Sequence, residues 1–123
     1  MRFGYSRSDR VSELILQEVS WIIRNGVKDP RIGFVTVTAV ELSPDLRHAR
    51  IYCSVMGNEE EKIRSWRVLN RAKGYIRSSF GHRVRLKYLP EFVFVLDRSL
   101  ERVQRIDELL RGLSEKKDRQ EEG

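Results

Sequence analysis

The stretch "NRAKGYIRSSFGHRVRLKY" (Asn70–Tyr88) decides the fold, because it has the pattern of a helix interrupted by a glycine. Glycine in a helix interior costs about 1 kcal/mol relative to alanine. A bend at Gly74 explains this residue, and it would open a place where another backbone can approach closely. The pattern therefore predicts two helices, the second from about Tyr75 to Phe80. A straight helix that tolerates its glycine stays open as the alternative.

The helical pattern begins before this stretch, near Glu60, and it is amphipathic. At 100° per residue the apolar side chains fall on one side of the helix and the arginines on the other. The predicted buried side consists of Trp66, Leu69, Ala72, Ile76 and Phe80. The predicted exposed side carries Arg64, Arg67, Arg71 and Arg77.

The same region contains no acidic residue between Glu61 and Glu91. It holds nine of the 24 lysines and arginines, which leaves fifteen basic against eighteen acidic side chains elsewhere, a net charge of −3. The positive charge of the chain (+6) is therefore local. We call the nine lysines and arginines of this region the acid-free block. Like charges three and four residues apart repel by a few tenths of a kcal/mol per pair. Because something other than helix stability must favour them, we expect the block to bind a polyanion. A solvated helix face is the alternative.

The flanking sequence predicts one more helix and three strands. Apolar residues at spacings of three and four predict a helix from about Arg10 to Asn25, capped by Ser8 or Asp9. Strands are predicted at Phe34–Leu42 and across Ala49, Ile51, Cys53 and Val55, joined by a turn at "SPDL", with a third at Phe92–Leu96. Because a long helical stretch separates the last two strands, we expect a parallel crossover between them.

The length of 123 residues indicates one domain. We expect a flexible N-terminus at 1–7, a folded domain at 8–98, an amphipathic helix at 99–113 and a disordered tail at 114–123. The third strand is apolar on both faces, and the helix after Ser99 is a candidate to cover its second face. Gly112 is a possible helix stop.

Catalytic and metal-binding arrangements are not predicted. Cys53 with His48 and His82 cannot form a tetrahedral metal site, and Cys53 is expected to be an inert core thiol rather than a nucleophile. The acids Glu59–Glu61 suit a helix N-terminus better than a magnesium site. We therefore expect no enzyme activity and no cofactor.

No apolar run approaches the ~20 residues of a membrane span, and the opening "MRFGYSRSDR" lacks the apolar core of a secretory signal. We expect a cytoplasmic protein.

The predicted order is helix, hairpin, two helices broken by a small-residue turn, and strand, which is the type II KH arrangement of RNA-binding modules. A KH domain has a Gly-x-x-Gly loop between the two helices, whereas this sequence has Ala72-Lys73-Gly74. In this it resembles the bacterial ribosome-binding factor A family, whose members carry an Ala-x-Gly kink there. The segments 7–19, 28–55 and 69–101 fit the same family in order.

The resemblance implies an α+β fold with a single KH-like (type II) domain, a three-stranded mixed sheet with helices on one face, and a C-terminal helical segment. It also implies a ribosome assembly factor that binds the free small (30S) ribosomal subunit. Such a factor assists late maturation of 16S rRNA, including its 5′ end, leaves before translation, is no nuclease and is associated with growth in the cold. We expect a monomer with no membrane or small-molecule partner.

The site implied by the resemblance is the kink at Ala72, Lys73 and Gly74 with the cations around it. The predicted RNA-binding residues are Arg64, Arg67, Arg71, Lys73, Gly74, Arg77, Arg83, Arg85, Lys87, Lys28 and Arg31. Asp29 and Pro30 are expected to form a structural turn. His82 is either a partner contact or an ordinary surface histidine.

Two other functions remain open at this level. One is a general single-stranded nucleic-acid module, although only two aromatic side chains, Tyr75 and Tyr88, lie near the block. The other is a protein interaction domain that uses the apolar third strand and docks an acidic partner on its basic face.

Overall fold

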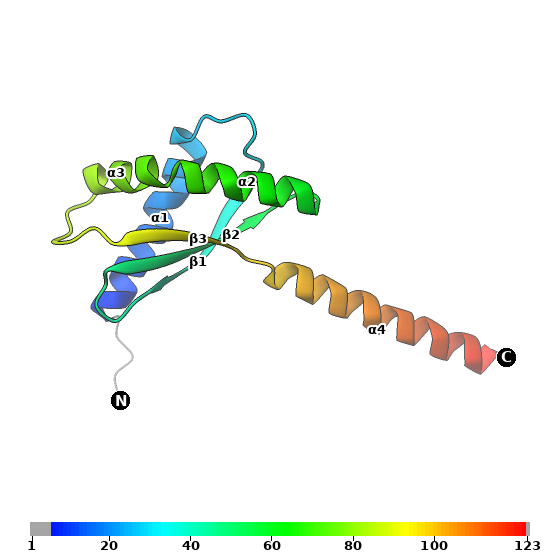
Figure 1. Ribbon diagram of the computed structural model, residues 1–123. Helices are drawn as coiled ribbons and strands as arrows, with labels where there is room; N and C mark the ends of the chain where they lie inside the picture. Colours follow the sequence, from blue (N-terminus) through cyan, green and yellow to red (C-terminus); the bar gives the residue numbers. More distant parts are fainter. Residues whose placement is uncertain (1–5, 123) are drawn as a thin grey trace.

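The computed structural model describes residues 6–122 and has the predicted order of elements (Figure 1). The elements are α1 (Arg7–Gly26), β1 (Val35–Leu42), β2 (His48–Val55), α2 (Glu59–Arg71), α3 (Lys73–Arg83), β3 (Glu91–Leu96) and α4 (Ser99–Glu122). The three strands form one sheet in the order β1-β2-β3. Strands β1 and β2 are antiparallel, and β2 and β3 are parallel, which confirms the predicted crossover.

The core lies between one face of the sheet and the helices α1, α2 and α3. The alternating residues of β2, Ala49, Ile51, Cys53 and Val55, are all buried as predicted. Burial raises the pKa of the Cys53 thiol to about 12, so this side chain stays protonated and unreactive at neutral pH.

The beginning of α1 differs slightly from the prediction. The cap is Ser6, not Ser8 or Asp9: the Ser6 side chain accepts a hydrogen bond from the Asp9 N–H, and the Asp9 carboxylate accepts one from the Ser6 N–H. This reciprocal capping box satisfies two N–H groups that lack helical partners. The folded part therefore includes Ser6 and Arg7, which the sequence had assigned to a flexible N-terminus. The rest of that segment, residues 1–5, lies outside the described residues.

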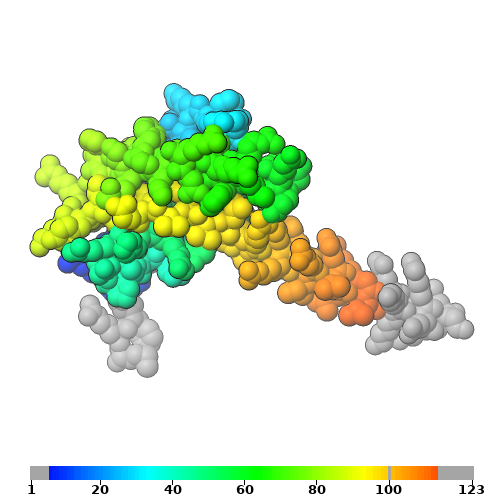
Figure 2. All heavy atoms as spheres, in the orientation of Figure 1, coloured from blue at the N-terminus to red at the C-terminus, as the bar shows by residue number. Residues whose placement is uncertain are grey.

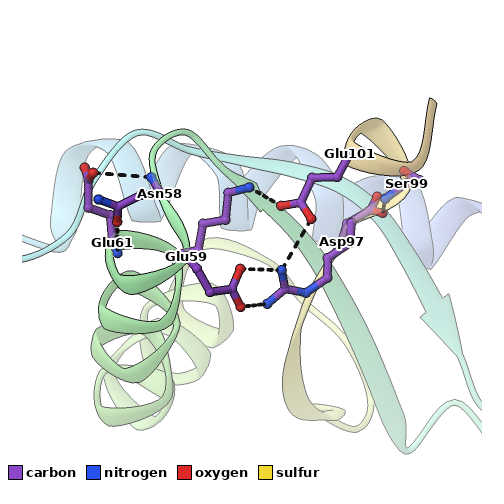
Figure 3. A network of polar contacts seen from close by, with 8 residues as sticks. Asn58, Glu59, Glu61, Asp97, Ser99 and Glu101 are labelled. Atoms are coloured by element: carbon purple, nitrogen blue, oxygen red, sulfur yellow. Dashed lines mark hydrogen bonds and ion pairs between the residues drawn. The ribbon is translucent and has the colours of Figure 1, made fainter. Parts of the chain in front are cut away.

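Helix α2 begins with a second capping box, between Asn58 and Glu61. Glu59, Glu60 and Glu61 occupy its first turn, where carboxylates interact favourably with the helix dipole, as predicted. Glu59 also pairs with Arg98 just before α4, at 2.5 Å, and Glu101 of α4 pairs with Lys62 of α2 (Figure 3). These ion pairs attach the start of α4 to the start of α2.

The division of the long helical pattern into two helices is confirmed, but the break lies at Ala72 rather than at Gly74. Ala72 has φ −84° and ψ 0°, and it separates α2 from α3. Its N–H donates to Val68 O (2.9 Å) and its carbonyl accepts from Ile76 N–H (2.9 Å), so the two helices continue almost end to end. Gly74 lies in the first turn of α3, and a Cβ added to it would meet nothing within 4 Å. The fold itself therefore does not require a glycine there.

The helix pair packs on the sheet through its predicted apolar side. Leu69, Ile76 and Phe80 are fully buried, and the Phe80 ring meets the Phe92 ring of β3 edge to face at 5.6 Å. Trp66 is partly buried and donates its indole N–H to Phe94 O (2.8 Å). Both helices are thereby held in one orientation above β3.

Helix α4, the candidate to cover the second face of β3, does not cover it. It extends away from the domain (Figures 1 and 2), and its apolar side chains Val103, Ile106, Leu109, Leu110 and Leu113 are 56–64% exposed. Val93 of β3 is 48% exposed. The helix also passes Gly112 and continues to Glu122, where a disordered tail had been predicted. The sequence after Gly112 contains no proline and is rich in helix-forming Glu, Lys, Arg and Gln, which accounts for the difference.

Arg77 of α3 has a structural role. Its guanidinium donates to the carbonyls of Pro90 (2.8 Å) and Leu89 (3.0 Å) and lies 3.4 Å from a Glu91 carboxylate oxygen. It therefore attaches the loop that enters β3 to the middle of α3.

Replacing Arg77 by alanine should lower the free energy of unfolding by roughly 1–3 kcal/mol, because two carbonyls lose a charged donor. Arg71→Ala is the matched control: Arg71 is exposed, so its loss should change stability by no more than about 0.5 kcal/mol. Urea denaturation of both variants measures the difference. Equal stability of the two variants would contradict the anchoring role of Arg77.

Candidate nucleic-acid interface

The break between α2 and α3 lies beside the end of α1 and the loop that follows it. A Cβ added to Gly26, the last residue of α1, would lie 2.7 Å from Tyr75 Oη in α3. The loop residue Asp29 has its pKa lowered to about 2, first by hydrogen bonds from Arg31 and more weakly by the positive charge of Arg71. The loop therefore lies within electrostatic range of the end of α2.

The loop itself has a defined geometry. The Asp29 carboxylate accepts hydrogen bonds from the Arg31 backbone N–H (2.9 Å) and from the Arg31 guanidinium (2.7 and 3.0 Å). The Ile32 N–H donates to Asp29 O (3.1 Å). These bonds agree with the predicted turn and hold Arg31 at the surface, while the neighbouring Lys28 is exposed.

We call the group Lys28, Arg31, Arg71, Lys73 and Gly74 the kink surface. All five residues are exposed, and they come from the α1–β1 loop and from both sides of the helix break. Only Arg31 among the four cations has an ion pair with another described residue. The kink surface thus combines unneutralised positive charge with a stretch of backbone that no side chain covers at Gly74.

The remaining predicted RNA-binding residues fall into two classes. Arg64 and Arg67 extend the exposed side of α2 beyond the kink surface, and Arg85 and Lys87 are exposed in the α3–β3 loop; none of the four has an ion pair within the described part of the chain.

Arg77 and Arg83 form the second class, because both are bound within the domain. Arg83 pairs with Glu18 of α1 at 2.5 Å, and its guanidinium lies 3.9 Å from the centre of the Trp21 ring. Both arginines stabilise packing within the domain, which the sequence pattern did not indicate. His82 is exposed, and its Nδ1 lies 2.7 Å from Ser78 O in the preceding turn, as in an ordinary helical histidine.

Sequence reasoning missed one surface residue beside the block. Arg47, in the β1–β2 turn, places its guanidinium 5.4 Å from the centre of the exposed Tyr88 ring. The two residues are 41 positions apart, and only the pairing of His48 with Glu91 in the parallel ladder brings them together. A correct prediction of the register between β2 and β3 would have placed Arg47 near Tyr88.

The part of the chain that the structure describes has neither a metal-binding cluster nor a membrane-spanning helix. Between Ser6 and Glu122 no group of three or more His, Cys, Asp or Glu side chains is arranged to hold a metal ion. None of the helices α1–α4 has a stretch long and apolar enough to span a lipid bilayer.

The sequence has close relatives among characterised families. A family model described as Ribosome-binding factor A matches residues 7–110. The chain is 45% identical to ribosome-binding factor A of Brevibacillus brevis over 117 residues, 95% of this chain and 97% of that protein. It is 48% identical to ribosome-binding factor A of Halothermothrix orenii, over 91% of this chain and 92% of that protein.

Solved structures agree with the sequence comparisons. The crystal structure of ribosome-binding factor A from Thermus thermophilus superposes with a TM-score of 0.66 at 27% identity, over 77% of this chain and all of that chain. A Thermus thermophilus ribosome binding factor A homology model, fitted into a cryo-EM map of a 30S complex of that factor, gives a TM-score of 0.60 at 29% identity, over 71% of this chain and 91% of that one. With its KH-like order of elements and its Ala72-Lys73-Gly74 break, the chain belongs to the ribosome-binding factor A family.

Proposed function

We propose that this protein is a cytoplasmic, non-enzymatic ribosome assembly factor that binds the free small (30S) ribosomal subunit. It assists late maturation of 16S rRNA, including the 5′ end, and leaves before translation. Family membership supports this proposal, as does the 30S complex of the Thermus thermophilus factor. The single observation that carries it is the kink surface, where Lys28, Arg71 and Lys73 are exposed without an ion pair among the described residues and Gly74 leaves the backbone bare.

The kink surface suits a folded RNA rather than a short single strand. The compact ammonium groups of Lys28 and Lys73 and the planar guanidinium of Arg71 are hydrogen-bond donors that suit phosphate oxygens. They come from separate segments, so they can contact phosphates that are close in a folded RNA and distant along its strand. Phosphate contacts position a protein on RNA without reading its sequence. The mechanism is therefore binding: the factor holds one conformation of immature rRNA while neighbouring segments dock.

Gly74 has a specific place in this mechanism. Because nothing within 4 Å would oppose a Cβ there, internal packing does not explain the glycine. A side chain at this position would point away from the domain, into the space that a bound phosphate backbone would occupy. The missing side chain permits that close approach.

The first test removes two cations of the kink surface. In the Arg71→Ala/Lys73→Ala variant, affinity for purified small subunits should fall, and the slope of log affinity against log salt concentration should decrease by about 2, one for each phosphate contact. Arg77 stays in place because it anchors the α3–β3 loop. Filter binding at several salt concentrations measures both quantities.

The matched control removes two cations elsewhere. Arg105→Ala/Arg111→Ala changes the net charge equally, at two exposed positions of α4. This variant should bind like the original protein. If the two double variants bind alike, net charge rather than the kink surface accounts for affinity. Short single-stranded RNA that competes as well as whole subunits would instead favour the general nucleic-acid module.

The second test separates stability from binding at Gly74. Gly74→Ala should raise the free energy of unfolding by about 0.5–1 kcal/mol, because alanine is the better helix former and the added methyl group meets no neighbour. The same change should weaken subunit binding, since the methyl group enters the RNA contact.

Gly112→Ala is its control, because Gly112 also lies within a helix and has nothing within 4 Å of an added Cβ. It should have unchanged subunit affinity. Undiminished binding by Gly74→Ala would remove the functional explanation of this glycine.

A further inference from the structure

The loop between α3 and β3 holds one exposed aromatic ring on a fixed backbone. Arg77 binds the carbonyls of Leu89 and Pro90, and Pro90 is buried. Leu89 packs closely on α3: a Cβ added to Gly81 would lie 2.7 Å from its Cδ1. Tyr88, directly before these anchored residues, is 60% exposed. The ring is therefore at the surface although the chain next to it is fixed.

Two cations from different segments lie over this ring at a distance. Arg47 Cζ lies 5.4 Å and Lys87 Nζ 5.5 Å from the ring centre. The β1–β2 turn that carries Arg47 is fixed beside the loop by the bond from Glu91 N–H to Arg47 O (2.8 Å). Both distances are near the ~6 Å limit of a cation–π contact. By contrast, the Arg83 guanidinium lies 3.9 Å from the Trp21 ring centre, so that ring is closely covered.

The carboxylates near the ring are engaged elsewhere. Asp45 accepts hydrogen bonds from Ser43 Oγ (2.6 Å) and from the Arg47 backbone N–H (3.0 Å), and Glu91 lies 3.4 Å from Arg77. Within the described residues, neither Arg47 nor Lys87 has a side-chain ion pair. Their charges are available to an external anion.

Tyr88 lines two hollows. One, of about 230 Å³, is also lined by Leu46, Leu86 and Lys87 and by the engaged carboxylate of Asp45. The other, of about 320 Å³, is also lined by Arg47, His48 and Leu89 and by Glu91. Each hollow thus combines an apolar wall, the aromatic ring and a cation. A flat apolar group attached to a negative charge matches all three features.

We propose that Tyr88, Arg47 and Lys87 form a second RNA contact, in which one unpaired nucleotide stacks its base on Tyr88 while the two cations hold its flanking phosphates. The proposal rests on the proposed function, because it takes RNA as the partner. An acidic protein segment would pair with the cations but leave the ring without a flat partner. This contact lies at the far end of α3 from the kink surface (Figure 1), so the two contacts would hold a folded region and an unpaired nucleotide at once.

The test compares Tyr88→Ala, Tyr88→Phe and the control Phe34→Ala. Base stacking on an aromatic side chain is worth ~1–3 kcal/mol, so Tyr88→Ala should weaken small-subunit binding roughly five- to hundredfold. The salt slope should stay unchanged, because no phosphate contact is lost. Tyr88→Phe should keep the affinity, because it keeps the ring. Phe34 is a 69% exposed aromatic at the opposite end of the sheet, and its replacement should have no effect.

Ultraviolet crosslinking of the complex identifies what touches the ring. The expected product is a peptide with a nucleotide attached to Tyr88. Unchanged binding of Tyr88→Ala, an equal loss in Tyr88→Phe, or a crosslink from Tyr88 to a ribosomal protein would overturn the proposal. In each of these outcomes the Arg71→Ala/Lys73→Ala variant can still lose affinity with a reduced salt slope, so the proposed function is judged separately.

Discussion

The burial of Leu69, Ile76 and Phe80 against the sheet is the constraint on which the rest of the structure depends. Since β2 and β3 are parallel, the chain must cross over the sheet between them, and α2 with α3 makes that crossing. Once their apolar side faces the sheet, the arginines of α2 must face outward. The same packing places Ala72, half-buried at the break, so that Gly74 is exposed.

The acid-free block has two separate roles. Arg77 and Arg83 lie on α3 and bind the α3–β3 loop and α1, respectively, which makes α3 the element that joins the parts of the domain. Arg71 and Lys73, at the helix break, have no such internal partner among the described residues. Mutual repulsion of outward cations disfavours the free protein slightly. In the proposed function, RNA phosphates remove that repulsion on binding.

Periodicity was enough to predict most of the fold. The alternation in β2 and the apolar spacing of the helices depend on local sequence, and both are confirmed. The break was predicted from Gly74 and found at Ala72, because a φ of −84° needs no glycine and the sequence carries no other signal for the position. The direction of α4 could not be predicted from local pattern, and the ion pairs at its start, Glu59 with Arg98 and Lys62 with Glu101, join residues 39 positions apart.

The candidate site was less predictable than the fold. Charge density identified the block, but only tertiary contacts distinguish Arg77, which binds loop carbonyls, from Arg71, which is exposed. Likewise, Arg47 joins Tyr88 only through the register of β2 and β3. Local pattern therefore predicts which residues are cationic and outward, whereas strand register and loop packing determine which of them are available to a partner.

The most direct test of the kink surface is lysine acylation of the protein, alone and in complex with purified small subunits, followed by mass spectrometry. We expect Lys28 and Lys73, exposed in the free protein, to become strongly protected in the complex. Lys62, which pairs with Glu101, should react at the same slow rate in both states. If Lys28 and Lys73 react as fast in the complex as in the free protein, the kink surface does not contact the subunit and the central claim is wrong.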